Sequence, residues 1–212
     1  MKIAVIQAST QVARNEVLFE ETKRAVAHLN AGVLNFGVSE NEENFSYVQI
    51  ALCVGILINS GAVDFVVTGC SSGNGMNIAA NALPNVISGY LPTPTDAYLF
   101  GRINQGNCAS LPLGLNFGWA GELNLRFTLE KLFEEPLNAG YPKEAAERKK
   151  ADALKLKEIK ELAQTSMINI LTGLSAEFIQ PILEKSDLLD YIFKNGTNLE
   201  LIKFLKGHKN GR

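Results

Sequence analysis

The chain has 212 residues, of which 46% are hydrophobic and 20% are charged. These proportions are typical of a folded globular protein and exclude a disordered or low-complexity chain. The formal net charge is only -2, so we expect no nucleic-acid partner and no anionic membrane surface. Three cysteines and two histidines are too few for a disulfide framework or a zinc centre, and we expect no metal.

The N-terminal segment gives no sign of export. The first ten residues, MKIAVIQAST, turn polar at Gln7 before a long apolar stretch forms, which is not typical of a signal peptide. The longest apolar-rich stretch, residues 50–58, is too short to span a bilayer. We therefore expect a cytoplasmic protein without a membrane partner.

The first 141 residues alternate apolar runs with amphipathic stretches. The runs predict strands in residues 2–6, 33–36, 63–67, 86–90 and 108–111. Between and after them, the patterns predict helices in residues 15–29, 46–59, 76–83, from about 95 onward, and 121–133. Near-continuous apolar strands are typical of a parallel sheet covered on both faces. We predict an α/β fold: a three-layer α/β/α Rossmann-like domain with a five-stranded parallel sheet, residues 1–141.

The remaining residues, 142–212, carry no strand pattern and predict an all-α C-terminal extension. Helices are expected in residues 142–171, 175–183, 187–194 and 199–205. The mixed charges of residues 143–160 indicate an exposed helix face. Ile159, Leu162, Ile168 and Leu171 are expected to pack the other side of this helix on the domain or on a neighbouring subunit.

The most informative segment for chemistry is residues 68–76, TGCSSGNGM, which follows the third predicted strand and leads into a helix. A strand, a glycine-rich turn and a helix N-terminus together present several backbone N–H groups to an anion. Ligands of parallel sheets bind at the carboxyl ends of the strands. Cys70 lies at this position, where the helix N-terminus favours the thiolate and can make the sulfur a base or a nucleophile.

Three known phosphate or nucleotide loops do not fit this segment. A P-loop needs a lysine, and none is present; a Cys-based phosphatase needs an arginine where Met76 stands; and a dinucleotide fingerprint follows the first strand. The plain alternative is a buried cysteine in a structural turn. Five of the eight residues 69–76 are glycine or serine, which favours a binding loop over that alternative. Cys53 and Cys108 lie in apolar runs and are expected in the core.

Residues 70–81, CSSGNGMNIAAN, resemble the signature C-G-[TS]-G-x-G-x-x-x-A-x-N of the ribose-5-phosphate isomerase B and galactose-6-phosphate isomerase family. The start MKIA, the segment RINQGN at residues 102–107, Gly114 and the helix ending at Phe133 are similar to the family as well. The resemblance covers residues 1 to about 150. It implies an aldose–ketose isomerase that acts on a sugar or on a pentose or hexose phosphate and uses no metal or organic cofactor. It also implies a homo-oligomer, a dimer or tetramer whose sites borrow residues from a partner.

The resemblance assigns roles to individual residues. It makes Cys70 the base that moves a proton between C1 and C2 of the sugar through a cis-enediolate, with Ser72 as the second catalytic residue. The expected substrate-binding residues are Ser71, Gly73, Asn74, Gly75, Asn104, Asn107 and Asp96. The backbone N–H groups of residues 71–75 form an anion hole for the enediolate, and Asn104 holds sugar hydroxyls. Asp96, which follows the fourth strand, binds a hydroxyl or caps a helix.

Several family positions differ in this chain. Ser9 stands in place of one histidine, Ile103 in place of the ring-opening histidine, and Asn116 in place of the phosphate-binding arginine. The substrate can therefore differ from ribose 5-phosphate, and it need not be phosphorylated. Two alternatives stay open at this stage: a non-catalytic sugar or sugar-phosphate binder, and a hydrolase with Cys70 as nucleophile. Arg102 and Lys143 or Arg148 are candidate anion partners, although a solvated surface charge is the expected role of each.

Overall fold

One five-stranded parallel sheet forms the centre of the molecule. The computed structural model describes residues 1–42 and 45–210. The strand order is β2-β1-β3-β5-β4, and all neighbouring pairs are parallel. The strands are β1 (Lys2–Val5), β2 (Gly32–Asn35), β3 (Phe65–Cys70), β4 (Ser88–Tyr90) and β5 (Cys108–Pro112). The predicted sheet is confirmed, with small shifts at the strand ends.

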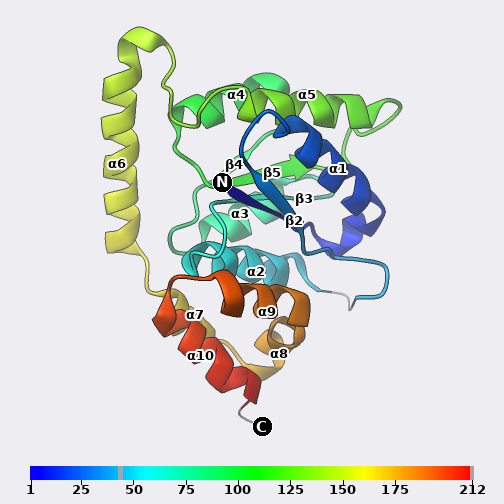
Figure 1. Ribbon diagram of the computed structural model, residues 1–212, viewed down its shortest axis with the longest axis vertical. Coiled ribbons are helices and arrows are strands. Elements are labelled where there is room, and N and C mark those ends of the chain that lie inside the picture. Colours follow the sequence, from blue (N-terminus) through cyan, green and yellow to red (C-terminus); the bar gives the residue numbers. More distant parts are fainter. Residues whose placement is uncertain (43–44, 211–212) are drawn as a thin grey trace.

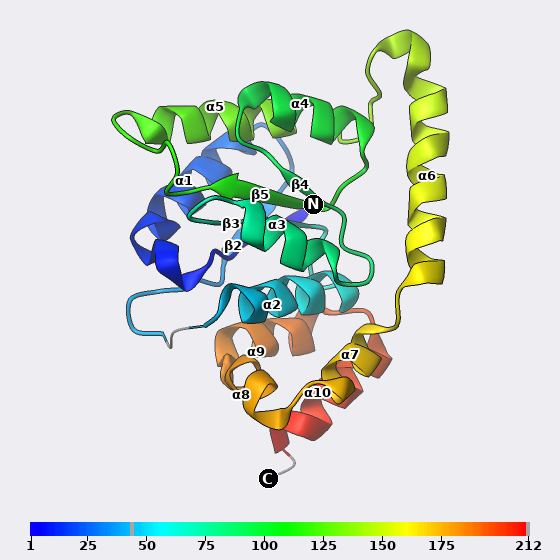
Figure 2. The same ribbon diagram turned by 180° about the vertical axis from the view of Figure 1, so that it is seen from behind.

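Helices cover both faces of the sheet, which confirms the three-layer α/β/α architecture (Figures 1 and 2). One face carries α1 (Asn15–Ala25), α4 (Pro94–Ile103) and α5 (Gly121–Phe133), and the other carries α2 (Tyr47–Asn59) and α3 (Asn74–Asn81). A 3-10 helix, η1 (Ser9–Arg14), joins β1 to α1. None of the described helices has the length and apolar character needed to cross a membrane.

The alternation of side chains along β1 explains why residues 3–6 are all apolar. Ile3 and Val5 lie in the core shared with α1, α4 and α5, whereas Ala4 and Ile6 lie in the core shared with α2 and α3. Successive side chains of a strand point to opposite faces, so a strand covered on both sides must be apolar at every position.

The C-terminal extension is helical, as predicted, and its described residues contain no strand. It comprises a 3-10 turn, η2 (Lys143–Ala145), and the helices α6 (Ala146–Ala163), α7 (Met167–Gly173), α8 (Ala176–Glu184), α9 (Ser186–Asn195) and α10 (Leu199–Asn210). The prediction of one continuous helix over residues 142–171 is wrong. The chain becomes extended at Gln164, and the hydroxyl of Ser166 caps α7 by accepting the Asn169 N–H at 3.2 Å.

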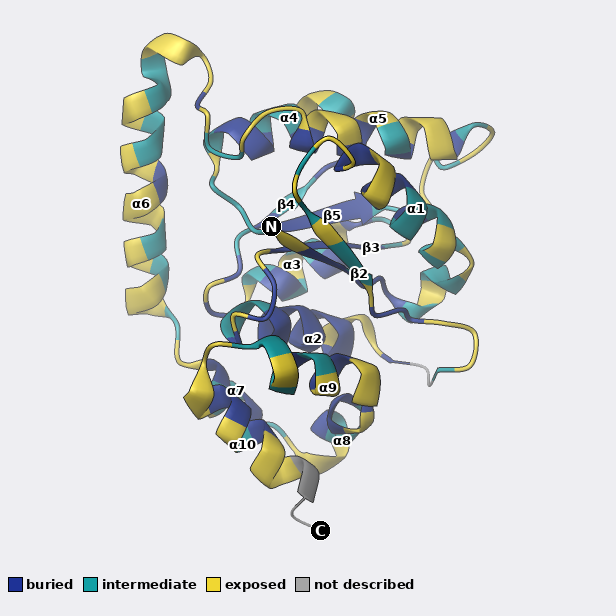
Figure 3. Ribbon diagram, viewed as in Figure 1, coloured by how far each residue is buried: buried dark blue, intermediate teal, exposed yellow. Residues whose placement is uncertain are grey.

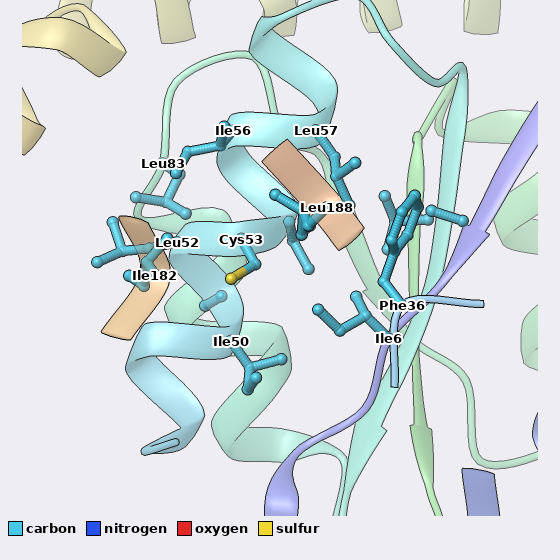
Figure 4. Packing of buried hydrophobic residues seen from close by; sticks show 14 of the residues in the cluster. Ile6, Phe36, Ile50, Leu52, Cys53, Ile56, Leu57, Leu83, Ile182 and Leu188 are labelled. Carbon is cyan, nitrogen blue, oxygen red and sulfur yellow. The ribbon is translucent and has the colours of Figure 1, made fainter. Parts of the chain in front are cut away.

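Helices α7–α10 pack on the side of α2 that faces away from the sheet. Ile182 of α8 and Leu188 of α9 lie in the same hydrophobic core as Leu52, Cys53 and the sheet residues (Figure 4). Residues 49–57 of α2 are therefore buried on all sides, which explains why this part of the helix has no polar face. The boundary between residues 141 and 142 stays a prediction, since α2 and α7–α10 share one core.

Helix α6 stands apart from the rest of the molecule and runs past the amino ends of the strands (Figures 1 and 3). Lys157 and Lys160 attach it by donating to the Gln105 side chain at 3.2 Å and to the Asn81 carbonyl at 2.8 Å. Ile159 is 54% exposed and Leu162 is 82% exposed. The expectation that these two residues pack on their own domain is wrong, which leaves a neighbouring subunit as the predicted cover.

Candidate active site

The loop of residues 70–75 lies at the carboxyl end of the central strand β3 and leads into α3. Gly73 caps this helix with a φ of +78°, a conformation that L side chains rarely adopt. A β-carbon there would lie 2.7 Å from the Tyr90 ring and 2.9 Å from the carbonyl carbon of Leu111. The hydroxyl of Ser110 on β5 donates to the Gly73 carbonyl at 2.7 Å. The backbone of this loop is therefore fixed by β4 and β5, and only glycine fits at position 73.

Segments that follow β5 and β1 hold the loop from two further sides. The Ser71 carbonyl accepts the N–H groups of Gly114 at 3.0 Å and Leu115 at 2.7 Å. The Gln11 side chain of η1 donates to the Ser71 hydroxyl at 2.9 Å, and the Thr10 hydroxyl lies 3.4 Å from it. The sequence did not single out Thr10 or Gln11. Their position directly after β1, at the same edge of the sheet as Cys70, is the signal that could have found them.

The first turn of α3 leaves backbone donors open toward this edge. Its first bond to a preceding carbonyl runs from the Asn77 N–H to the Gly73 carbonyl at 3.0 Å. The N–H groups of Gly75 and Met76 therefore have no acceptor within the helix. The Asn74 N–H donates to the Ser72 hydroxyl oxygen at 3.3 Å. The turn can stabilise a developing negative charge without rearranging, as an anion hole requires.

Cys70 differs from the other two cysteines in its exposure. Its side chain is half-buried, whereas Cys53 and Cys108 are 0% exposed. Burial raises the pKa of both buried thiols to about 12, so they stay protonated and inert at neutral pH. The expectation that Cys53 and Cys108 belong to the core is confirmed. Met76, which follows the loop, is also fully buried and offers no acid–base group.

Asp96 lies in the first turn of α4, where it takes part in helix capping. The Thr93 hydroxyl donates to the Asp96 carboxylate at 2.6 Å and accepts the Asp96 N–H at 3.2 Å. The side chain is exposed at the carboxyl edge, on the far side of β5 from Cys70. Of its two predicted roles, the capping contact is the one visible within this chain.

Asn104 and Asn107 lie at the amino edge of the sheet, opposite to Cys70. Asn107 precedes β5, where its side-chain oxygen accepts the Ile87 N–H at 2.8 Å and its amide donates to the Asn85 carbonyl at 2.7 Å. Asn104 is exposed at the C-terminal end of α4. Within one chain, these two residues do not come together with the loop of residues 70–75.

The positions that depart from the family pattern have other tasks here. The Ser9 hydroxyl donates to the Phe45 carbonyl at 2.6 Å, and Asn116 is an exposed turn residue with a φ of 58°. Ile103 is half-buried at the end of α4. Arg102 is 1% exposed and donates to the Leu132 carbonyl at 2.8 Å, so the expectation of a solvated surface charge is wrong. Burial lowers the pKa of this guanidinium.

A cleft of about 590 Å³ lies at the carboxyl end of β2, lined in part by Asn15, Asn35 and Lys185. Lys185 is buried and forms ion pairs with Glu42 and, at 3.3 Å, with Asp187. Burial is the largest single influence on Glu42 and would raise its pKa, but the hydrogen bonds from Lys185 and Ser39 and the Lys185 charge together outweigh it, so the pKa is lowered. Because Lys185 is already shared between two carboxylates and β1 separates β2 from β3, we place the candidate site at Cys70. Within residues 1–42 and 45–210, no cluster of three acidic, histidine or cysteine side chains could hold a metal.

The comparison with known families agrees with this geometry. The family model described as Ribose/Galactose Isomerase matches residues 3–133, which is more than half of the chain. The chain belongs to the ribose/galactose isomerase family. The matched residues include all five strands and the loop of residues 70–75. Sugar and sugar-phosphate aldose–ketose isomerases make up this family.

Solved structures extend the match to the C-terminal helices. A 4-deoxy-L-threo-5-hexosulose-uronate ketol-isomerase complexed with a tartrate is 38% identical, with a TM-score of 0.93, over 98% of this chain and 99% of that chain. A ribose-5-phosphate isomerase from Vibrio parahaemolyticus is 34% identical, with a TM-score of 0.92, over the same shares. A type B ribose 5-phosphate isomerase from Trypanosoma cruzi shares the fold at 20% identity and a TM-score of 0.63, over 77% of this chain and 98% of that chain. No curated protein matches the chain.

Proposed function

We propose that this protein is an aldose–ketose isomerase in which Cys70 is the catalytic base. The observation that carries the proposal is the half-buried thiol of Cys70 beside a helix turn with open N–H donors. This arrangement pairs a proton acceptor with a group that stabilises the resulting oxyanion.

The proposed reaction moves one proton between adjacent carbons. The Cys70 thiolate removes the proton from C2 of an open-chain aldose, and the C–H electron pair forms the C1–C2 double bond. The carbonyl oxygen becomes the enediolate oxygen, which the N–H groups of Gly75 and Met76 stabilise. The proton of the O2 hydroxyl passes to O1, and the Cys70 thiol returns its proton to C1 to give the ketose.

We assign to Ser72 the task of assisting the proton transfer between O2 and O1. Its hydroxyl oxygen already accepts the Asn74 N–H, so its own proton remains to be donated to a substrate oxygen. We assign Ser71, Gly73, Asn74 and Gly75 to substrate binding through the loop backbone. The Ser71 hydroxyl is already held by Gln11, which favours its backbone over its side chain for this role.

The substrate class follows from the relatives and from position 116. One relative acts, by its name, on a hexosulose uronate, and another on ribose 5-phosphate. Asn116 cannot supply the bidentate guanidinium contact that a phosphate group favours. We infer a sugar or sugar phosphate of five or six carbons, with a sugar acid as a substrate to be tested beside the phosphates.

The direct test measures deuterium exchange at C2 of aldose and ketose phosphates and of ketouronates. Wild type should exchange, and Cys70→Ala should lower the rate by about 10²- to 10⁴-fold, the usual contribution of a general base. Cys108→Ala, which alters a buried thiol of β5, is the matched control and should keep the exchange. Equal rates for wild type and Cys70→Ala would show that Cys70 is not the base.

The replaced histidine positions, Ser9 and Ile103, favour one alternative, a sugar binder that has lost the chemistry. Calorimetric titration with the same compounds would then show affinity without isotope exchange. A thiol-nucleophile hydrolase would leave a covalent adduct on Cys70 in intact-mass spectra, which the isomerase does not form. Each outcome separates one alternative from the proposed isomerase.

We further propose that the protein is a homo-oligomer in which Asn104 of one subunit completes the site of another. This is supported by the position of Asn104 at the edge opposite to Cys70 and by the exposed apolar residues of α6. In a dimer, mixing equal amounts of Cys70→Ala and Asn104→Ala chains should restore about a quarter of the activity, because random pairing makes about half of the dimers mixed and one of the two sites in each mixed dimer is intact. Analytical ultracentrifugation gives the assembly state, and no recovery on mixing would place Asn104 outside the site.

A further inference from the structure

Arg14 is a cation of the carboxyl edge that no described acid neutralises. It is the last residue of η1, and its side chain is half-buried. Its guanidinium carbon lies 3.9 Å from the centre of the Phe117 ring. In the described part of the chain, no carboxylate or carbonyl accepts a hydrogen bond from it. Stacking on an aromatic ring holds the plane of a guanidinium while leaving its N–H groups at the rim of the stack available to a ligand.

Both partners of this stack belong to segments that touch the candidate catalytic loop. Gln11, on the same 3-10 helix as Arg14, donates to the Ser71 hydroxyl at 2.9 Å. The Phe117 N–H donates to the Gly114 carbonyl at 3.2 Å, and the Gly114 N–H donates to the Ser71 carbonyl at 3.0 Å. Arg14 and Phe117 are thus each three residues from a direct contact with Ser71. Figure 1 shows the start of α1 and the start of α5, which continue from these segments, at the same end of the sheet.

Lys185, the lysine near this edge, is not available to bind a ligand anion. Lys185 is buried and shared between Glu42 and Asp187. A ligand anion that binds beside the loop therefore finds on Arg14 a charge that no acid of the described residues pairs with. Arginine is also the residue whose fork of donors matches the two oxygens of a carboxylate or a phosphate.

We propose that Arg14, held by Phe117, binds the anionic end of the substrate, a carboxylate or a phosphate at the far end of the sugar from the reacting carbons. This inference rests on the proposed function, because the anion in question belongs to the substrate of the Cys70 site. Arg14 touches the substrate at a group that does not react, so it determines affinity and specificity, and Phe117 is the residue that positions it.

The test measures anion binding directly, without catalysis. Tartrate and inorganic phosphate are titrated separately into wild type, Arg14→Gln and Arg148→Gln by calorimetry, with the fluorescence of the single tryptophan, Trp119, as a second readout. Arg148 is an exposed arginine of α6 and is the matched control. Arg14→Gln should weaken the preferred anion by about 10- to 100-fold, the usual value of a charge-assisted hydrogen bond. Arg148→Gln should bind as wild type does.

The relative affinities for tartrate and phosphate show whether the substrate carries a carboxylate or a phosphate. Tighter binding of tartrate assigns the subsite to a sugar acid, and tighter binding of phosphate assigns it to a sugar phosphate. Cys70→Ala should bind both anions as wild type does, so a failure of the Cys70 assignment leaves this result readable. Equal affinity of Arg14→Gln and wild type, or the absence of anion binding by folded wild type, would overturn the inference.

A positioning role of Phe117 has its own signature. Phe117→Leu keeps an apolar side chain but removes the aromatic face beneath the guanidinium. Once a substrate is known, this variant and Arg14→Lys should raise KM about 3- to 30-fold with little change in kcat, because both alter ground-state and transition-state binding alike. A fall in kcat at constant KM would contradict the assignment of Arg14 to a non-reacting group.

Discussion

The two edges of the central sheet are built from similar small polar residues but use them differently. At the amino edge, the Asn107 side chain forms one hydrogen bond with the Ile87 N–H and one with the Asn85 carbonyl, and Asn81 forms two hydrogen bonds with Ser88. At the carboxyl edge, the first turn of α3 keeps N–H donors open and Cys70 is half-buried. Polar side chains that are hydrogen-bonded to the backbone stabilise the fold. Donors that have no acceptor within the helix, and whose position is fixed, are available to a ligand.

The difference in exposure between cysteines at the two edges gives the largest expected effect. Cys70 ends β3 at the carboxyl edge, and Cys108 begins β5 at the amino edge with 0% exposure. Iodoacetamide should modify native protein at Cys70 at least about a hundredfold faster than at Cys53 or Cys108, because the buried thiols react only when the structure opens. Peptide mass mapping over time measures the rates, and unfolding in urea should make the three rates similar. Similar modification rates of Cys70 and Cys108 in the native protein would show that the two edges do not differ in cysteine accessibility.

The variant Gly73→Ala tests whether the N–H donors at the carboxyl edge depend on the left-handed backbone conformation of Gly73. Gly73→Ala should lower the free energy of unfolding by about 2 kcal/mol, because the left-handed φ is strained for alanine and the β-carbon meets Tyr90 and Leu111. Urea unfolding measures the change, and anion titration should show weaker binding to the folded variant. Gly173→Ala is the matched control, since a β-carbon there meets no atom within 4 Å. A Gly73→Ala protein as stable as wild type would show that the loop can relax.

At the amino edge, Asn107 and Asn104 allow a comparison between an asparagine that is bonded to the backbone and one that is exposed to solvent. Asn107→Ala should cost about 1 to 3 kcal/mol of unfolding free energy, because the Ile87 N–H and the Asn85 carbonyl lose their partners. Asn104→Ala removes an exposed side chain and should change stability by no more than about 0.5 kcal/mol. Thermal and urea unfolding of both variants provide the measurement. Equal costs would mean that Asn107 is not the residue that secures this edge.

Asp96 gives the smallest expected change, and it tests whether the carboxyl edge contains residues used only for structure. Asp96→Ala should lower the unfolding free energy by about 0.5 to 1 kcal/mol through loss of its contact with Thr93. Thr93→Ala, which removes the other half of the same cap, should have a similar effect. A loss of sugar affinity in Asp96→Ala but not in Thr93→Ala would instead assign the carboxylate to the ligand.

Much of this protein could be predicted from local sequence patterns. The five apolar runs form strands whose ends are shifted by at most three residues, and the helix of residues 121–133 and the Ser175 cap are found as predicted, because periodicity and capping act within a few residues. The long helix expected over residues 142–171 was wrong because Ser166 begins a new helix with its own cap. The loop of residues 70–75 and the family were recognisable for the same local reason: their chemistry lies in consecutive residues.

The sequence by itself determined the α/β class, the order of strands and helices along the chain, the glycine loop and its cysteine. The tertiary structure decided which distant residues meet: Gln11 with Ser71, Arg14 with Phe117, and α2 with α7–α10. It also decided that Arg102 is buried and that Asn107 is occupied by the backbone. These contacts depend on the strand order β2-β1-β3-β5-β4, which brings the segments after β1 and β5 to either side of β3. No periodicity within a few residues encodes that order, because it results from packing the whole sheet and its helices at once.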